Sequence, residues 1–306
     1  MVTESRPVAD VSTTERQSGI ESATRPSRSL WRIALRRFLR NRLAVASAIF
    51  LIVMYGVAIF ANVLAPYDPN EVDIMALHAR PSADHWLGTD ENGRDVLSRV
   101  MYGSRASMTV GLVAVLISVT IGSLVGSIAG YLGGFVDTIL MRITDGMLAI
   151  PYFFFVLIVV AVFGSSFRNL VLVIGMTSWM AVSRIMRSEV LRYKRFDFVL
   201  AAESIGATSP RVLFRHILPH TVPVVIVAAT LGVATAILLE SALSFLGLGI
   251  RPPTASWGNM LSNSQAYLWQ NPMLPIYPGM LIFLTVLAYN FMGDALRDAL
   301  DPQARD

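Results

Sequence analysis

The sequence predicts an all-α polytopic membrane protein with six transmembrane helices. Of its 306 residues, 54% are apolar and only 15% are charged, whereas a soluble domain carries roughly 25% charged residues. The charge is missing from long blocks rather than thinned evenly, which is typical of several membrane spans. The chain contains no cysteine, which excludes disulfides and thiol chemistry.

Six apolar blocks are each about long enough to cross roughly 30 Å of hydrocarbon as a helix. Most contain few or no charged residues, and proline interrupts only some of them. The predicted spans are Leu43–Leu64, Met108–Tyr131, Met147–Phe163, Leu170–Met186, Val222–Leu243 and Ile276–Met292. In the third span Pro151 predicts a bend, because proline frees a backbone carbonyl inside a helix.

The distribution of Lys and Arg predicts the orientation. With the N-terminus in the cytoplasm, 19 of the 25 basic residues lie inside: nine before Leu43, Arg142, seven between Arg184 and Arg215, and two in the tail. Because Lys and Arg concentrate in cytoplasmic loops, both termini are predicted inside. The expected location is the cytoplasmic (plasma) membrane, with several crossings.

The N-terminal region divides into two parts before the first span. Residues 1–28 are rich in Ser, Thr, Arg and Glu, which predicts a disordered cytoplasmic tail rather than a signal peptide. Residues 29–42 alternate apolar side chains with arginines at helical spacing. This pattern predicts an amphipathic helix on the inner membrane surface, facing anionic lipid. Residues 43–306 form the transmembrane domain.

Two outside segments are predicted, over residues 65–106 and 244–275. The first contains seven acidic residues, but their spacing matches no calcium loop, so no metal site is predicted. In the second, glycines and prolines break the helix, and Ser256 is placed to cap a short helix that starts at Trp257. This arrangement leaves the tryptophan available for a partner or for the membrane interface.

Small residues recur at every fourth position through the second span and indicate close helix packing. They are Ala114, Ser118, Gly122, Gly126, Gly130 and Gly134.

A few polar residues inside the spans are candidates for a translocation path. Thr177, Ser178 and Trp179 lie in the fourth span, where polar groups face protein or a water-filled path. Pore lining and interhelical hydrogen bonding both fit them. Glu240 is the one acid well inside a predicted span. We favour a structural glutamate held by neighbouring hydroxyls and amides, because a proton relay needs a second titratable group.

The cytoplasmic loop over residues 187–220 contains a polar stretch that is longer than a simple connection needs. Gly206 is a predicted helix C-cap, and Thr208 or Ser209 is a predicted N-cap followed by Pro210. The second helix is expected to end near His216, before Pro219 opens the fifth span. Two short helices around a glycine can fill a groove on another protein; the alternative is an idle loop resting on lipid.

The spacing from Ala201-Ala202 through Gly206 to Leu218-Pro219 resembles the signature loop of permease subunits in binding-protein-dependent ABC importers. Further runs resemble the second permease of dipeptide, oligopeptide and nickel importers: residues 37–43, 87–99, 243–249, 256–261 and 293–302. The resemblance covers nearly everything after residue 30. It implies the type I ABC importer permease fold.

The resemblance also implies a role for the loop, as the coupling helix that docks in a groove of a cytoplasmic ATPase. The implied contact residues are Ala201, Ala202, Glu203, Gly206, Ser209, Arg211, Phe214, Arg215, Leu218 and Pro219. Leu200 occupies the position where the family carries a glutamate, and Glu203 follows about one turn later. The chain lacks a Gly-x-x-x-x-Gly-Lys-[Ser/Thr] run. A non-catalytic subunit without cofactors is therefore expected, with ATP and Mg bound by the partner ATPase.

The implied partners are a homologous second permease, one or two ATPase subunits, an extracytoplasmic solute-binding protein and membrane lipid, but no nucleic acid. Trp86, Asp90, Arg94 and Trp257 are the candidate docking residues for the binding protein. Peptides are the expected solute; nickel chelates, haem or another small solute are the alternatives. A secondary transporter or channel would need paired ionisable groups in the spans. A membrane scaffold would not need ordered outside segments.

Overall fold

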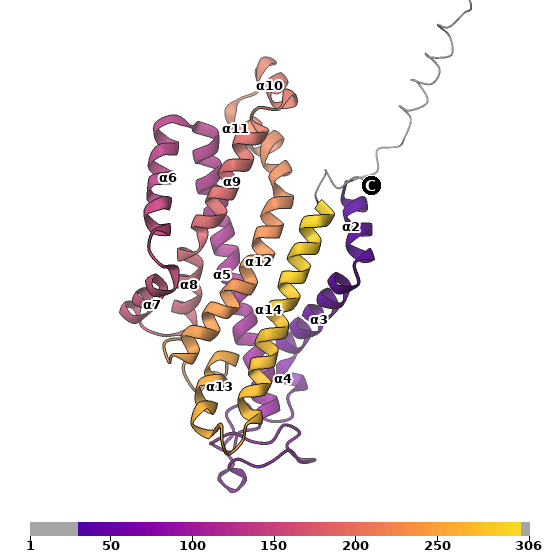
Figure 1. Ribbon diagram of the computed structural model, residues 1–306, viewed down its shortest axis with the longest axis vertical. Coiled ribbons are helices and arrows are strands. Elements are labelled where there is room, and N and C mark those ends of the chain that lie inside the picture. The colour runs from indigo at the N-terminus through magenta and orange to yellow at the C-terminus, as the bar shows by residue number, and fades with distance from the viewer. Residues whose placement is uncertain (1–29, 301–306) are drawn as a thin grey trace, which may run out of the picture.

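The computed structural model describes residues 30–300, and within that range the chain is helical apart from turns and one isolated bridge between Thr89 and Asp95. Most of the helices run along one long axis, as Figure 1 shows. They are α2 (Leu30–Arg40), α3 (Arg42–Ile59), α4 (Ala61–Leu64), η2 (Ile74–Ala76), α5 (Val96–Leu132), α6 (Gly134–Leu148), α7 (Tyr152–Phe163), α8 (Phe167–Thr177), α9 (Trp179–Tyr193), α10 (Asp197–Ser204), α11 (Ser209–Arg211), a π-helical turn (Val212–Ile217), α12 (Leu218–Phe245), α13 (Trp257–Ser264), η4 (Gln265–Tyr267) and α14 (Met273–Leu300).

The helices confirm a protein with several membrane spans. Five segments of the described chain are long and apolar enough to cross a membrane, or six if the bent pair α6 and α7 counts as one. The five are Arg42–Ile59, Val96–Leu132, Phe167–Tyr193, Ser209–Phe245 and Met273–Leu300.

The predicted third span, Met147–Phe163, is bent at Pro151 as expected, but its start differs from the prediction. Met147 belongs to the end of α6, and α7 begins only at Tyr152. The two helices meet at a bend of 86°, and Pro151 lies in the break, where its ring and missing N–H prevent a continuous helix.

The second helix of the loop over residues 187–220 does not end near His216, contrary to the prediction. Ser209 to Phe245 forms one apolar helical segment in which α11, the π-helical turn and α12 follow one another. Leu218 N donates to Leu213 O, five residues back. This wider turn leaves room for the Pro219 ring, so the helix passes through the proline instead of stopping there.

Helix α5 lies at the centre of the bundle and packs against α9, α12, α8 and α3. Its small-residue stripe faces α9. A Cβ atom built on Gly122 would lie 2.7 Å from Trp179 O, and one on Gly130 would lie 2.9 Å from Arg187 O. The stripe therefore lets two helix backbones touch, as predicted. Gly134 is the exception, because it lies beyond the end of α5 with nothing close to it.

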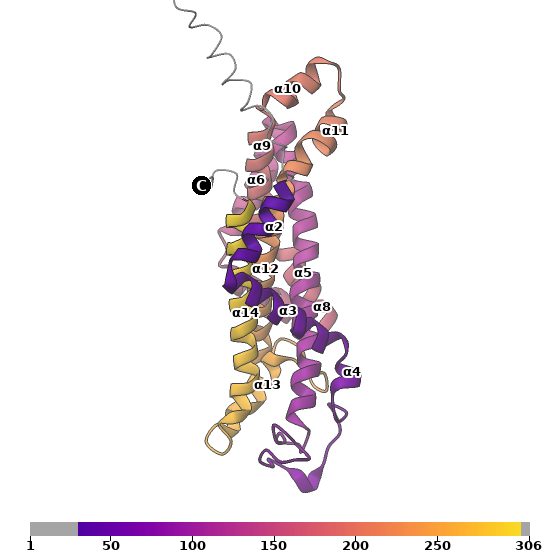
Figure 2. The ribbon, with the colours of Figure 1, turned by 90° about the vertical axis from the view of Figure 1, so that its right-hand side faces the viewer.

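The two ends of the bundle carry different segments (Figures 1 and 2). Helices α10 and α11 lie at one end, which we call the coupling end. Residues 65–95 and α13 lie at the opposite end, which we call the cap end. Helix α2 and the last turn of α14 lie in the half that holds the coupling end. The predicted disordered tail, residues 1–28, lies outside the described residues.

Helix α2 is separate from the first span and packs against α14 and α3. Asn41 interrupts the two, and its Oδ1 accepts hydrogen bonds from Leu43 N at 3.0 Å and Ala44 N at 3.2 Å. These bonds cap α3. The exposed side chains of Leu35 and Leu39 lie one turn apart on α2 and give it an apolar stripe.

Candidate functional site: the coupling segment and the cap

The coupling segment, Asp197–Ile217, begins with α10 and a tight glycine turn. Gly206 has a φ of +86°, a left-handed conformation that favours glycine. Gly206 N donates to Glu203 O at 3.0 Å, and Ala207 N donates to Ala202 O at 3.0 Å. This pair of bonds is the Schellman motif, so Gly206 closes α10 as predicted. Thr208 then precedes α11, with Pro210 in its first turn.

An apolar cluster fixes the coupling segment to the bundle. Val199, Val212 and Ile217 are fully buried and pack with Met186 and Val190 of α9. The π-helical turn also continues directly into α12. A force applied to the segment therefore acts on the ends of two spans at once.

The outward face of the segment combines apolar and basic side chains. Ile205 is 87% exposed and Phe214 is 64% exposed, and Arg211 and Arg215 are exposed beside them. Among the predicted coupling residues, Ala202 is buried and Leu218 is half-buried. The other eight are exposed: Ala201, Glu203, Gly206, Ser209, Arg211, Phe214, Arg215 and Pro219. The prediction missed Ile205, although a large apolar residue directly before a C-cap glycine was a visible signal.

Aromatic ring contacts join the coupling segment to the end of α9 and the start of α12, which the sequence did not reveal. His220 stacks on Tyr193 with ring centroids 5.4 Å apart, and it also contacts Phe198 at 5.1 Å. Lys194 Nζ donates to Tyr131 O at 2.8 Å and so ties α9 to the end of α5. These contacts join residues that are distant in sequence, so no local pattern indicates them.

At the cap end, residues 87–99 form a buried polar knot at the start of α5. Arg94 Nε pairs with Asp90 Oδ2 at 2.7 Å, and Arg99 Nε lies 3.3 Å from the same oxygen. The Asp95 carboxylate caps α5 by accepting from Ser98 N at 2.8 Å. A Cβ atom on Gly93 would overlap Asp73 O, so the knot needs glycine there. The contacts of residues 87–99 hold the loop of residues 65–86 against the start of α5.

Three of the four predicted docking residues are not available at the surface. Trp257 is fully buried, and its Nε1 donates to Val100 O at 3.2 Å, so the prediction that its ring is available to a partner is wrong. Gly103 makes room for the ring, because a Cβ there would lie 3.1 Å from Trp257 Cδ1. Asp90 and Arg94 are buried in their ion pair. Trp86 alone is exposed, at 70%.

Glu240 lies fully buried between α5, α12 and residues 250–257, the segment that we call the cap. Its carboxylate accepts hydrogen bonds from Ser107 Oγ at 2.9 Å and Ser244 Oγ at 2.7 Å. Each serine in turn accepts from a backbone N–H of the cap: Trp257 N reaches Ser107 Oγ at 3.3 Å, and Ile250 N reaches Ser244 Oγ at 3.1 Å. Glu240 is thus held by hydroxyls, and it joins two spans to the cap.

The other candidate path residues bond locally. Thr177 Oγ1 donates to Val173 O at 2.6 Å, and Ser178 Oγ donates to Ile174 O at 2.7 Å. Both residues sit where α8 ends, and Trp179 begins α9 half-buried. Their hydroxyls satisfy their own helix backbone, so they stabilise the junction between α8 and α9.

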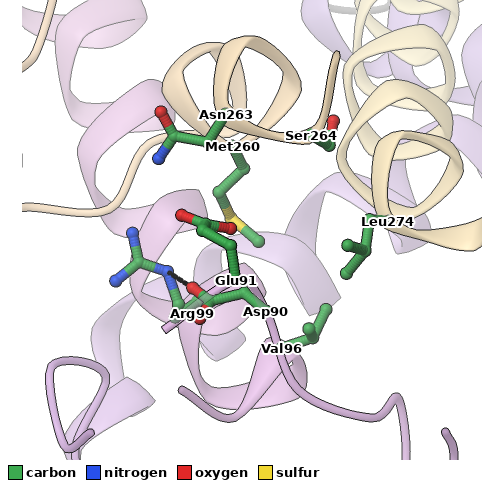
Figure 3. Close-up of a pocket in the computed structure, with 8 residues that line it drawn as sticks. All are labelled: Asp90, Glu91, Val96, Arg99, Met260, Asn263, Ser264 and Leu274. Carbon is green, nitrogen blue, oxygen red and sulfur yellow. Dashed lines mark ion pairs between the residues drawn. The ribbon is translucent and has the colours of Figure 1, made fainter. Parts of the chain in front are cut away.

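A small cavity lies beneath the polar knot, between α5, α13 and α14 (Figure 3). Its lining residues are Asp90, Glu91, Val96, Arg99, Met260, Asn263, Ser264 and Leu274. Arg99 Nη1 donates to Pro69 O at 2.9 Å, while Nη2 has no hydrogen-bond partner among the described residues. The charges around the cavity are paired mainly with one another, which suits a structural joint.

A family model decides what this arrangement belongs to. The model described as the binding-protein-dependent transport system inner membrane component matches residues 122–306. That range contains the coupling segment, Glu240 and Ser244 of α12, and the whole of α13. The chain belongs to this family and is a permease subunit of an ABC importer. A second model, the N-terminal transmembrane domain of oligopeptide transport permease C, matches residues 29–81 of the permease.

Related proteins align with nearly the whole permease. A putative peptide permease protein of Brucella suis biovar 1 is 44% identical over 270 residues, which cover 88% of this chain and 89% of that protein. The glutathione transport system permease protein GsiD of Shigella flexneri serotype 5b is 44% identical over 279 residues, covering 91% and 92%.

A solved structure shares the fold of the permease. The inward-facing MetNI methionine ABC transporter superposes with a TM-score of 0.55 at 16% sequence identity, covering 67% of this chain and 96% of that chain. At this identity the likeness concerns the fold alone. Permeases of this family work in general with an ATPase and a binding protein.

Proposed function

We propose that this permease forms half of a translocation path for peptides, with a homologous second permease forming the other half. The names of its relatives support this substrate class, since one is called a peptide permease and another a glutathione transport permease. The match of residues 29–81 to the oligopeptide permease C domain supports the place of this chain in the pair. A solute-binding protein delivers the peptide at the cap end.

One observation carries the energetic part of the proposal: an exposed apolar and basic face is fixed to the ends of two spans. Phe214 and Ile205 are exposed, while Val212 and Ile217, close by on the same segment, are buried against α9. A cytoplasmic ATPase that binds this face would move α9 and α12 together. The permease itself is non-catalytic, and its ATPase subunits bind the ATP and Mg.

The orientation follows from the same proposal. Within residues 30–300, most of the Lys and Arg residues lie in the half that holds the coupling end, among them Arg211, Arg215 and the arginines of α9. Because basic residues favour the cytoplasmic side, the coupling end and both termini are placed inside. The cap end then faces the binding protein.

Peptide uptake in reconstituted vesicles tests the function. The vesicles contain this permease, the second permease and the ATPase, with the binding protein outside and ATP inside. We expect ATP-dependent accumulation of labelled di- or oligopeptide that unlabelled peptide competes and nickel chelate or haem does not. Competition by the metal compounds alone would replace peptide with those solutes.

The same assay tests the coupling face through Phe214→Ala. Losing a large apolar interface contact costs roughly 1–2 kcal/mol, so uptake should fall on the order of tenfold. Phe135→Ala is the matched control, because Phe135 is an exposed aromatic on α6, outside the segment. Equal uptake by the two variants would contradict the assignment.

A further inference from the structure

A shallow hollow lies where α9 ends, in the half of the bundle that holds α10 (Figure 1). Its lining residues are Ser188, Leu191, Arg192, Arg195 and Phe196. The first four are spaced in the sequence as the residues on one face of a helix are. Two arginines and a hydroxyl therefore meet in one hollow, and none of its described lining residues is acidic.

The polar groups of the hollow have hydrogen-bond donors to spare. Ser188 and Arg195 are exposed, and neither side chain has a hydrogen-bond or ion-pair partner among the described residues. Arg192 is held in place by its neighbours: its Nη2 lies 2.9 Å from Glu189 Oε2 and donates to Tyr193 OH at 2.9 Å. Because these contacts use one nitrogen of the guanidinium, Arg192 still has N–H groups for an anion. The hollow thus offers several donors and the positive charge of Arg195.

The hollow lies at the level of the lipid headgroups. The span that contains α9, Phe167–Tyr193, is 27 residues long, which is about 40 Å as a helix. This length matches the thickness of a bilayer with its headgroup regions, so the last turn of α9 lies near the membrane surface. Tyr193 and Lys194 stand at this level, and interfacial tyrosine and lysine side chains are typical of the end of a span.

We propose that this hollow, the headgroup site (Ser188, Leu191, Arg192, Arg195 and Phe196), binds the phosphate of an anionic phospholipid. Arginine binds phosphate through charge-assisted hydrogen bonds, and the Ser188 hydroxyl adds one further donor. Leu191 and Phe196 contact the glycerol and the start of the acyl chains. The lipid belongs to the cytoplasmic leaflet, so the proposal rests on the orientation given with the proposed function.

A phospholipid suits the headgroup site better than a free anion or the ATPase does. Phe196 is 43% exposed, and an apolar side chain adds nothing to the binding of inorganic phosphate, whereas a lipid contacts it. The proposed ATPase contacts begin only at Ala201 on α10, while the hollow belongs to the end of a span. Anionic lipids of the cytoplasmic leaflet attract basic residues at this depth.

Native mass spectrometry of the full transporter with added dioleoylphosphatidylglycerol tests the proposal. The first variant is Arg192→Gln with Arg195→Gln, and the second is Ser188→Trp, which fills the hollow and keeps both charges. We expect the first to lower the affinity for this lipid on the order of tenfold, and the second to lower it as well. Neutral dioleoylphosphatidylcholine should bind the wild type far more weakly. The matched control is Arg142→Gln with Arg297→Gln, two exposed arginines on α6 and the last turn of α14, and it should retain the anionic lipid as the wild type does.

Three results would overturn the proposal. The first is equal retention of the anionic lipid by the wild type and both site variants, with equal melting temperatures showing that all are folded. The second is binding of inorganic phosphate as tightly as the lipid, which would make the hollow a site for a free anion. The third is loss of ATPase subunits from the site variants with unchanged lipid retention, which would assign the hollow to the ATPase.

Lipid retention is measured without peptide, which separates the headgroup site from the proposed function. Selective retention of the anionic lipid together with failed peptide uptake rejects the proposed substrate alone. Normal peptide uptake without that selectivity rejects the headgroup site alone.

Discussion

Glu240 orients two serine hydroxyls, and through them it fixes the cap to the spans. Because Ser107 and Ser244 donate to the carboxylate, their lone pairs face the backbone N–H groups of Trp257 and Ile250. A buried carboxylate without a cation is stable only when donors surround it. The residue therefore serves the joint between α5, α12 and the cap.

The Glu240 contacts predict a large stability effect for Glu240→Ala. The substitution removes the acceptor of two buried hydroxyls and leaves a cavity, which should lower the free energy of unfolding by about 2–4 kcal/mol. Thermal melting of the purified permease measures it. Ser241→Ala is the control, because Ser241 Oγ reaches the carboxylate only at 3.4 Å and should matter far less. Equal melting temperatures for the two variants would contradict this role.

At the residue scale, the sequence could predict local chemistry but not long-range burial. The bond from Ser244 to Glu240 was predictable because the serine lies one helical turn away, whereas the bond from Ser107 joins residues 133 apart. The burial of Trp257 was not, since a tryptophan in a glycine- and proline-rich stretch has the pattern of a surface loop. Its pocket depends on Gly103, more than a hundred residues earlier, and that contact exists only in the folded bundle.

At the element scale, the coupling segment joins a capped helix to a continuous helical span. The glycine turn and its φ were predictable, because the αL conformation has a clear sequence preference. The continuity through Pro219 was not, because a proline usually ends a helix. The π-helical turn before Pro219 accommodates the proline, so the helix continues through it. Val212 of the π-helical turn anchors the segment, so point substitutions on its exposed face test docking more directly than a deletion would.

Helix α6 shows why the start of the third span is hard to place from the sequence. Asp137 and Asp145 make the stretch appear polar in sequence, yet Arg187 pairs with Asp137 at 2.5 Å and Arg184 pairs with Asp145 at 2.5 Å. These partners come from α9, which packs against α6. A hydropathy average over a stretch of sequence includes these charges but does not show that they are paired.

The glycine turn predicts a specific effect of Gly206→Ala. A side chain at φ +86° is strained by roughly 1–2 kcal/mol, which should distort the docking face and lower ATP-driven uptake several-fold. Gly247→Ala is the matched control, because Gly247 has a φ of +77° and equally open surroundings at the other end. Uptake per folded transporter measures the difference. The same loss in both variants would mean that strain alone, not docking, explains it.

At the scale of the whole molecule, the bundle separates two surfaces by the length of the membrane spans. The coupling segment occupies one end, and residues 65–95 with α13 occupy the other (Figure 1). The presence of several spans and the family were readable from hydropathy and motifs, while the sidedness of the loops stays a prediction from the basic residues. The packing of α5 against α9 and the shape of each surface needed the fold.

The central claim is that an ATPase subunit docks on the coupling segment, and site-specific crosslinking tests it most directly. The chain has no cysteine, so Phe214→Cys and Trp86→Cys each provide a single attachment point for a photoactivated maleimide crosslinker in the full transporter. The account predicts that the probe at position 214 crosslinks to the ATPase subunit, with a yield that changes on adding ATP, and that the probe at position 86 does not. Crosslinking of the ATPase from position 86 and not from position 214 would contradict it.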